Sequence, residues 1–299
     1  MPLVSFNELM AGAERGGYAV GYFESWNLES LMAVADAADA TRSPVLLGFS
    51  GIFLTHPGRV VAEPLAGYAA LGLEVCRGLS VPAALIFNES PDLDAVLAAV
   101  NLGFSLVMFS DDDLDLAMQT ERVRQVVLDA HAAGVAAEGE AAALPGVGGE
   151  LTEFAGDARL TDVAMACSFV ESTGVDALAV NVGQMHLHGR QEVRLDLARL
   201  AELHEALPVP LVLHGATSVR REDLAAAIAC GVRKINVGSV LKQAYLGALR
   251  EACAALPEQY NPYEVIGSGL PADVLVAGRL ALQRSVEGLM HLFGSAGKA

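Results

Sequence analysis

Several side chains that could bind a metal stand directly after short apolar runs of the sequence. They are Glu24, Glu89, Glu138, Glu140, His186 and His214. Imidazole nitrogens and carboxylate oxygens are the usual ligands of a divalent metal that polarises an oxygen of the substrate. One isolated histidine is usually a structural side chain. Two histidines with several glutamates, at matching places in a repeated pattern, predict a divalent-metal site.

Two segments of small residues predict an anion site. Residues 214–218 (HGATS) and 236–239 (NVGS) each follow an apolar run and precede a helical pattern. Small residues at the start of a helix leave backbone N–H groups open to an anion. The same residue types also serve as ordinary caps and turns, so these segments are only moderately specific.

Two loops carry further candidates. Residues 145–150 (PGVGGE) predict a flexible lid, from which Glu150 would deliver a proton after closure. An acidic loop residue is more often simply solvated. Arg190 follows the sixth apolar run, where its fork of donors would close over an anion or lie in solvent as a surface charge.

Eight short apolar runs, rich in β-branched residues, set the spacing of all these side chains. They cover 18–23, 45–49, 81–87, 106–109, 135–138, 177–182, 211–213 and 234–237. Each is too short for a buried helix, and segments of helical periodicity lie between them. Strand and helix in alternation, with nearly continuous apolar strands, predict a (β/α)8 barrel, a TIM barrel whose active site lies at the carboxyl ends of its strands.

The C-terminal part of the chain predicts additional helices outside the barrel, over 240–255 and 272–293. No change of composition and no linker divides the chain. We therefore expect residues 1–299 to form a single domain.

The composition excludes several classes of protein. The formal charge of −17 disfavours binding to nucleic acid or to an anionic membrane surface. No apolar stretch approaches the roughly 18 residues of a membrane span, and the N-terminus lacks the pattern of a signal peptide. The four cysteines lack paired spacing, which is typical of reduced thiols in a cytoplasmic protein.

Several segments resemble the class II, metal-dependent ketose-bisphosphate aldolases. The landmarks are PLVS at 2–5, GGYAVG at 16–21, SPV at 43–45, TGVDALAV at 173–180, VPLVLHG at 209–215 and KINV at 234–237. The resemblance covers nearly the whole chain. It implies a TIM barrel, an aldehyde-lyase activity in carbohydrate metabolism, a sugar or sugar-phosphate substrate, a bound zinc ion and a homodimer or homotetramer.

The resemblance also implies roles for individual positions. His186 and His214 match two of the three histidines that hold the catalytic zinc, and Glu140 matches a glutamate that contacts the metal in an alternative position. The positions that match substrate contacts are Ser50, Asn236 and, in the phosphate-binding loops, Gly215, Thr217 and Ser239. Arg190 stands where many members have a lysine of the loop that closes on the phosphate.

The chain departs from the family at the reaction centre. The third-strand signature of the family is His-x-Asp-His, whereas residues 86–89 are IFNE. Asn88 thus replaces the aspartate that acts as general acid and base, and an amide cannot shuttle a proton. Glu89 replaces the third histidine and is an acceptable metal ligand. Glu24 replaces an asparagine after the first strand, and Ser110 an aspartate after the fourth.

We therefore expect a metal-dependent aldolase-type lyase with a non-standard site, acting on a ketose phosphate or a related sugar or sugar acid. Glu89, His186 and His214 would hold the metal, and Glu24 or Glu150 would move the proton. Zn²⁺ is the expected ion, and the carboxylate ligand makes Mn²⁺ or Mg²⁺ the alternatives.

Two other functions are compatible with these residues. A metal-bound site that has lost its cleavage base could isomerise or epimerise a sugar or sugar acid. Alternatively, the chain is a catalytically silent paralogue that binds a sugar phosphate, since a fold by itself does not determine function.

Overall fold

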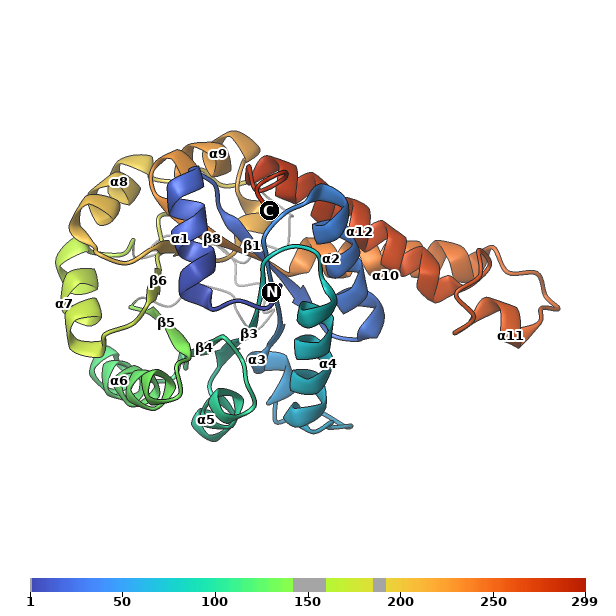
Figure 1. Ribbon diagram of the computed structural model, residues 1–299, viewed down its shortest axis with the longest axis horizontal. Coiled ribbons are helices and arrows are strands. Elements are labelled where there is room, and N and C mark those ends of the chain that lie inside the picture. The colour runs from blue at the N-terminus through green and yellow to red at the C-terminus, as the bar shows by residue number, and fades with distance from the viewer. Residues whose placement is uncertain (1, 142–159, 185–191) are drawn as a thin grey trace.

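A computed structural model describes residues 2–141, 160–184 and 192–299 and contains a closed barrel of parallel strands (Figure 1). Each strand pairs with the next in the sequence, and the last pairs with the first. The strands are β1 (Val20–Ser25), β2 (Val45–Ser50), β3 (Ala83–Ser90), β4 (Leu106–Phe109), β5 (Ala136–Glu140), β6 (Ala177–Ala179), β7 (Leu211–Leu213) and β8 (Val232–Val237). The predicted (β/α)8 architecture is confirmed.

Helices cover the outside of this barrel (Figure 1). They are α1 (Phe6–Gly16), α2 (Leu28–Thr41), α3 (Gly51–Leu54), α4 (Leu65–Gly78), α5 (Leu93–Asn101), α6 (Leu116–Ala132), α7 (Val163–Thr173), α8 (Leu197–Ala206), α9 (Arg221–Ala229), α10 (Ser239–Ala254), α11 (Pro262–Val265) and α12 (Val274–Leu292). None of the helices in the described ranges is long and apolar enough to cross a membrane.

Alternating residues of the strands build two separate apolar layers. One set points outward and packs against the helices in the larger cluster, as Leu47 and Leu85 do. The other set points into the barrel, where Leu46 and Ile86 share a cluster with Phe6 of α1. Because successive side chains of a strand face opposite sides, one apolar run can serve both layers. Helix α1 thereby closes one end of the barrel interior.

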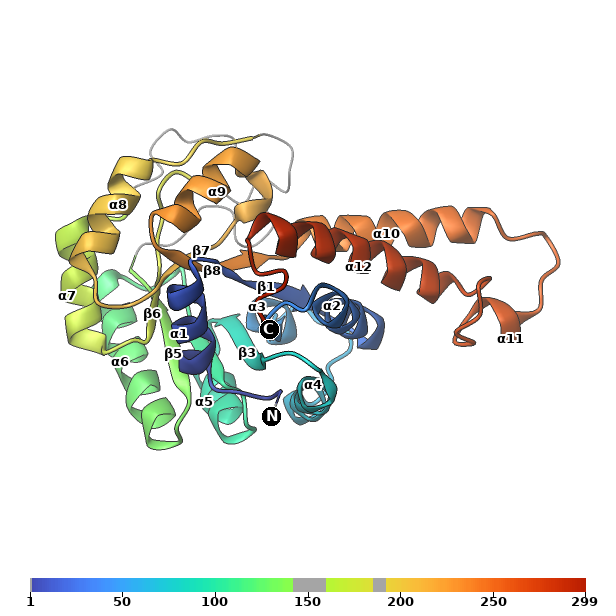
Figure 2. The same cartoon turned by 45° about the horizontal axis from the view of Figure 1, so that its top comes forward.

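The last helices form an arm that projects from the barrel (Figure 2). α10 and α12 pack side by side, α11 lies near the far end, and α12 also packs against α2. This arrangement confirms the additional C-terminal helices expected from the sequence.

Gly48 marks the closest approach of β2 to its neighbour. It is paired with Ile86 of β3, and a Cβ atom placed on Gly48 would lie 2.2 Å from the Ile86 carbonyl oxygen. That contact is far shorter than any van der Waals separation, so a side chain here would push the two strands apart.

We therefore expect Gly48→Ala to lower the free energy of unfolding by about 2 to 4 kcal/mol. Gly67→Ala in α4 is the matched control, because a Cβ there meets no atom within 4 Å. Replacing a glycine inside a helix by alanine leaves the free energy of unfolding unchanged or raises it by up to about 1 kcal/mol. Urea denaturation of both variants measures the difference, and equal stabilities would contradict this account.

Candidate active site

A cavity of about 290 Å³ opens at the carboxyl ends of the strands, where a barrel of this type places its active site. Side chains from β1, β2, β3, β7 and β8 and from the segments after them surround it. Those that the sequence analysis singled out are Glu24, Ser50, Asn88, Glu89, His214, Gly215, Thr217, Asn236 and Ser239. The structure therefore brings most of the described candidates to one place.

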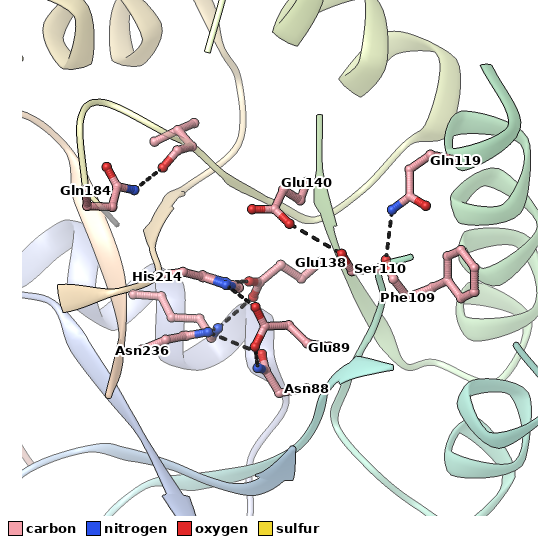
Figure 3. Close-up of polar contacts among 12 residues, drawn as sticks. Asn88, Glu89, Phe109, Ser110, Gln119, Glu138, Glu140, Gln184, His214 and Asn236 are labelled. Atoms are coloured by element: carbon pink, nitrogen blue, oxygen red, sulfur yellow. Dashed lines mark hydrogen bonds and ion pairs between the residues drawn. The ribbon is translucent and has the colours of Figure 1, made fainter. Parts of the chain in front are cut away.

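Six side chains beside this cavity join in a closed loop of hydrogen bonds and ion pairs, here called the polar ring (Figure 3). Its members are Asn88, Glu89, Glu138, His214, Lys234 and Asn236. They come from β3, β5 and β8 and from the residue after β7. The ring therefore forms only when these strands are assembled.

His214 contacts both carboxylates of the polar ring. Its Nδ1 is 2.7 Å from Oε1 of Glu89, and its Nε2 is 2.8 Å from Oε1 of Glu138. Burial opposes protonation of this imidazole, but the two carboxylates outweigh burial and raise the pKa of His214 to about 10. In the metal-free protein the histidine is therefore an imidazolium.

The remaining contacts close the ring. The Lys234 ammonium is 2.8 Å from Oε2 of Glu138 and donates to Oδ1 of Asn236 at 2.6 Å. Asn236 donates to Asn88 at 3.2 Å, and Asn88 donates to Oε2 of Glu89 at 2.7 Å. Burial would raise the pKa of Glu138, but Lys234 and His214 outweigh it and hold the pKa below its usual value.

An unusual backbone conformation places two neighbouring residues of β3 in the same ring. Successive residues of a regular strand point to opposite faces. Glu89 has a φ of 47°, in the left-handed region that non-glycine residues rarely adopt, and the pairing of β3 with β4 shifts its register between Phe87 and Ser90. This break in the strand lets both Asn88 and Glu89 reach the cavity.

The contacts of His214 fit a metal ligand. A metal-binding histidine usually donates its other ring N–H to a carboxylate, which fixes the tautomer. Glu138 is placed to accept from Nε2, which leaves Nδ1 of His214 and the Glu89 carboxylate as the groups that would hold a metal. Residues 2–141, 160–184 and 192–299 contain no group of three potential ligands close enough to hold a metal by themselves. His186, the third expected ligand, lies outside these ranges.

Glu140 lies near the ring but does not join it. Its Oε2 accepts from the Ser110 hydroxyl at 3.4 Å (Figure 3). Burial raises the pKa of the Glu140 carboxyl to about 8 against the lowering effect of His214, and the nearby charges of Glu89 and Asp112 add to the rise. Glu140 is thus a buried carboxyl that is largely protonated at neutral pH.

The other expected site residues divide into two groups. Glu24 lines the cavity, and its Oε1 accepts from the Lys242 ammonium at 2.6 Å. Glu150, His186 and Arg190 fall outside the described residues, so their expected roles remain predictions.

Three charged residues of the site are not singled out by the sequence. Glu138 is one of several strand-end carboxylates with no role of its own, and Lys234 is only part of a family landmark. Both are fully buried, and Lys242 beside the cavity is half-buried. A lysine within an apolar strand is a usable signal, because lysine is almost never buried without a partner.

Comparison with known proteins identifies the family. The model of the family "Fructose-bisphosphate aldolase class-II" matches residues 4–298. A fructose-bisphosphate aldolase of Geobacillus stearothermophilus is 33% identical over 305 residues, covering 100% of this chain and 99% of that protein. A sulfofructosephosphate aldolase of Alkalicoccus urumqiensis is 28% identical over 299 residues, with the same coverage of 100% and 99%.

A solved structure agrees with this assignment. The crystal structure of the YdjI aldolase from Escherichia coli K12 superposes with a TM-score of 0.80 at 26% identity, covering 99% of both chains. The chain therefore belongs to the class II fructose-bisphosphate aldolase family and is an aldolase-type lyase. Members of this family generally depend on a divalent metal, typically zinc, and act on sugar phosphates.

The raised pKa of Glu140 makes stability depend on pH. A carboxyl whose pKa rises from 4.5 to about 8 on folding stabilises the protein below pH 4.5, and this contribution is lost as the pH rises toward 8. Glu140→Gln mimics the protonated form and removes the loss. We expect this variant, in chelator, to unfold at a temperature several degrees above wild type at pH 9 and near wild type at pH 5.

The control for this experiment is Glu171→Gln, which removes an exposed carboxylate on α7. Thermal unfolding followed by circular dichroism measures all three proteins. A Glu140→Gln protein that is less stable than wild type at pH 9 would show that the buried group is needed as an anion.

The pair of Lys234 and Glu138 gives a second test. Lys234→Met removes one of the two cationic partners of the buried Glu138 carboxylate and leaves His214, at an expected cost of up to about 5 kcal/mol. The double variant Lys234→Met/Glu138→Gln removes that charge as well, and we expect it to recover at least about 1 kcal/mol. Urea denaturation of wild type, Lys234→Met, Glu138→Gln and the double variant decides, and a loss in the double variant equal to the sum of the two single losses would mean that the pair is not coupled.

Proposed function

We propose that this protein is a metal-dependent aldolase with a non-standard site, which cleaves a carbon–carbon bond of a ketose phosphate or a related sugar or sugar acid. The observation that carries the proposal is the placement of His214 between Glu89 and Glu138 at the barrel mouth. It supports the proposal because one ring nitrogen of His214 has a carboxylate to orient it and the other faces a second carboxylate.

Glu89 and His214, together with His186, are the proposed metal ligands, and Glu140 is the alternative one. Zn²⁺ is the proposed ion, and the carboxylate ligand makes Mn²⁺ or Mg²⁺ acceptable. When bound, the metal polarises carbonyl and hydroxyl oxygens of the substrate as a Lewis acid. Asn88 acts as a positioning residue, because its amide donates to the second oxygen of Glu89.

The substrate would occupy the cavity beside the polar ring. Ser50 and Asn236 lie on its wall, and the proposed anion contacts are Gly215, Thr217 and Ser239, with Arg190 closing over them. The proton that the family's aspartate would carry needs another residue, because Asn88 cannot exchange one. Glu24 is the first candidate, because it lines the cavity and burial raises the pKa of its carboxyl. A lid residue, Glu150, is the second candidate.

We also propose one domain over 1–299, a homodimer or homotetramer, and a cytoplasmic location. Exposed apolar side chains on and beside the arm, among them Leu246, Tyr263 and Ile266, support self-association. The cysteines of the described residues are free thiols, which suits a reducing compartment. Light scattering after gel filtration measures the molar mass in solution and thereby tests the proposed oligomeric state.

Metal content tests the proposed site. Elemental mass spectrometry of wild type purified without chelator should find about one Zn²⁺ or Mn²⁺ per chain. In Glu89→Ala and in His214→Ala we expect the apparent metal affinity to fall about tenfold or more, because each change removes a ligand. His291→Ala, an exposed histidine on α12, is the matched control and should keep its metal.

The same proteins are then assayed for aldehyde release from a panel of phosphorylated and unphosphorylated ketoses. Aldehyde formed by wild type and lost in both ligand variants supports the lyase. Ketose interconversion without aldehyde would replace it by an isomerase or epimerase. A wild type that takes up neither Zn²⁺ nor Mn²⁺ would replace it by a silent sugar-phosphate-binding protein.

A further inference from the structure

An ion pair stands on the cavity wall across β1 and α10. Lys242 of α10 donates to Oε1 of Glu24 at 2.6 Å. Its ammonium also lies 3.8 Å from the ring centroid of Phe53 and 5.8 Å from that of Trp26. Cation–π contacts of this kind, together with the carboxylate, hold the ammonium in one place.

Lys242 has a special position among the residues that form the cavity. It is the one lysine or arginine among the described residues of the wall. Its charge is already balanced by Glu24 at hydrogen-bonding distance. An anionic group of a substrate that enters the cavity therefore meets a neutralised pair and not a free cation.

The second oxygen of Glu24 lies against the start of α10. A Cβ atom placed on Gly238 would be 2.4 Å from Oε2 of Glu24. Gly238 is the residue that precedes the first turn of α10, and the N-terminus of a helix attracts negative charge. An internal carboxylate thus already lies beside the backbone that a phosphoryl group would otherwise approach.

We propose that Glu24 is a specificity-determining residue, which makes this corner of the cavity select an uncharged, hydroxyl-bearing end of the substrate and disfavour a phosphorylated one. The inference rests on the proposed function and narrows it, because Ser239 at the start of α10 would then contact a substrate hydroxyl and not a phosphate. A carboxylate oxygen accepts hydrogen bonds from sugar hydroxyls, whereas it repels a phosphate that carries no proton to donate.

The charge of Glu24 gives the size of the expected effect. Its carboxylate places one negative charge on the cavity wall. A like charge within about 5 Å of a bound phosphate weakens its binding by tenfold or more even with substantial screening.

Two ligands that differ only by a phosphoryl group test the proposal, namely dihydroxyacetone and dihydroxyacetone phosphate. Ligand-observed NMR titration of the Zn²⁺-supplemented full-length protein measures both dissociation constants without requiring turnover. We expect wild type to bind dihydroxyacetone at least as tightly as its phosphate. In Glu24→Gln, which releases Lys242, we expect the phosphate to bind at least about tenfold more tightly and dihydroxyacetone more weakly.

Matched variants separate this effect from a general change of charge or a failure to fold. Glu251→Gln removes one exposed carboxylate from the same helix, and we expect both constants to stay within about twofold of wild type. Glu24→Asn also removes the charge and takes the place of Glu24→Gln if that variant does not fold. We expect the same changes in both dissociation constants. In Glu24→Gln/Lys242→Met the gain for the phosphate should disappear, because no cation remains to be released.

The outcomes also distinguish this inference from the proposed function. Tighter binding of the phosphate by wild type, with no gain in Glu24→Gln or Glu24→Asn, overturns the inference and leaves the aldolase intact. A reversal of preference in Glu24→Gln, together with a wild type that releases no aldehyde from any ketose, supports the inference and counts against the aldolase.

Discussion

The placement of one histidine between two carboxylates is the constraint on which the site depends. His214 contacts Glu89 through one ring nitrogen and Glu138 through the other, and all three side chains are largely withdrawn from solvent. Buried charges are tolerated only when each has a partner. Lys234 balances Glu138 from β8, so the charges of the site are matched only when the ends of β3, β5, β7 and β8 meet at the mouth of the closed barrel. Assembly of the site therefore requires the closed barrel.

The end of strand β3 shows how two neighbouring side chains reach one site. Asn88 and Glu89 both point into the ring because Glu89 leaves the strand conformation. Such a backbone costs of the order of 1 to 3 kcal/mol and persists when surrounding contacts hold it. Here the bonds of Glu89 to His214 and Asn88 supply those contacts. The strained backbone belongs to Glu89, the residue whose carboxylate points toward His214.

Negative charges gather at the mouth of the barrel. Glu89 of β3 and Glu24 of β1 both line the cavity, and Glu24 pairs with Lys242. The fold by itself does not assign the substrate, because function depends on the side chains of the site and not on the barrel. The polar ring balances its charges internally, and the pair of Glu24 and Lys242 lies on the cavity wall.

The sequence by itself determined the barrel, the C-terminal helices and the set of polar residues at the strand ends, because strand periodicity and apolar runs are local properties. It did not determine which of these side chains contact one another. Glu138 and Glu140 lie two residues apart on one face of β5, yet the first contacts His214 and the second Ser110. Thr217 and Ser218 lie in a short 3₁₀ turn over Ala216–Ser218, and α9 begins after Arg220. Two residues that are two positions apart in a strand point to the same face, and this follows from the sequence. Only the tertiary structure brings His214, 76 residues away, to Glu138 and not to Glu140.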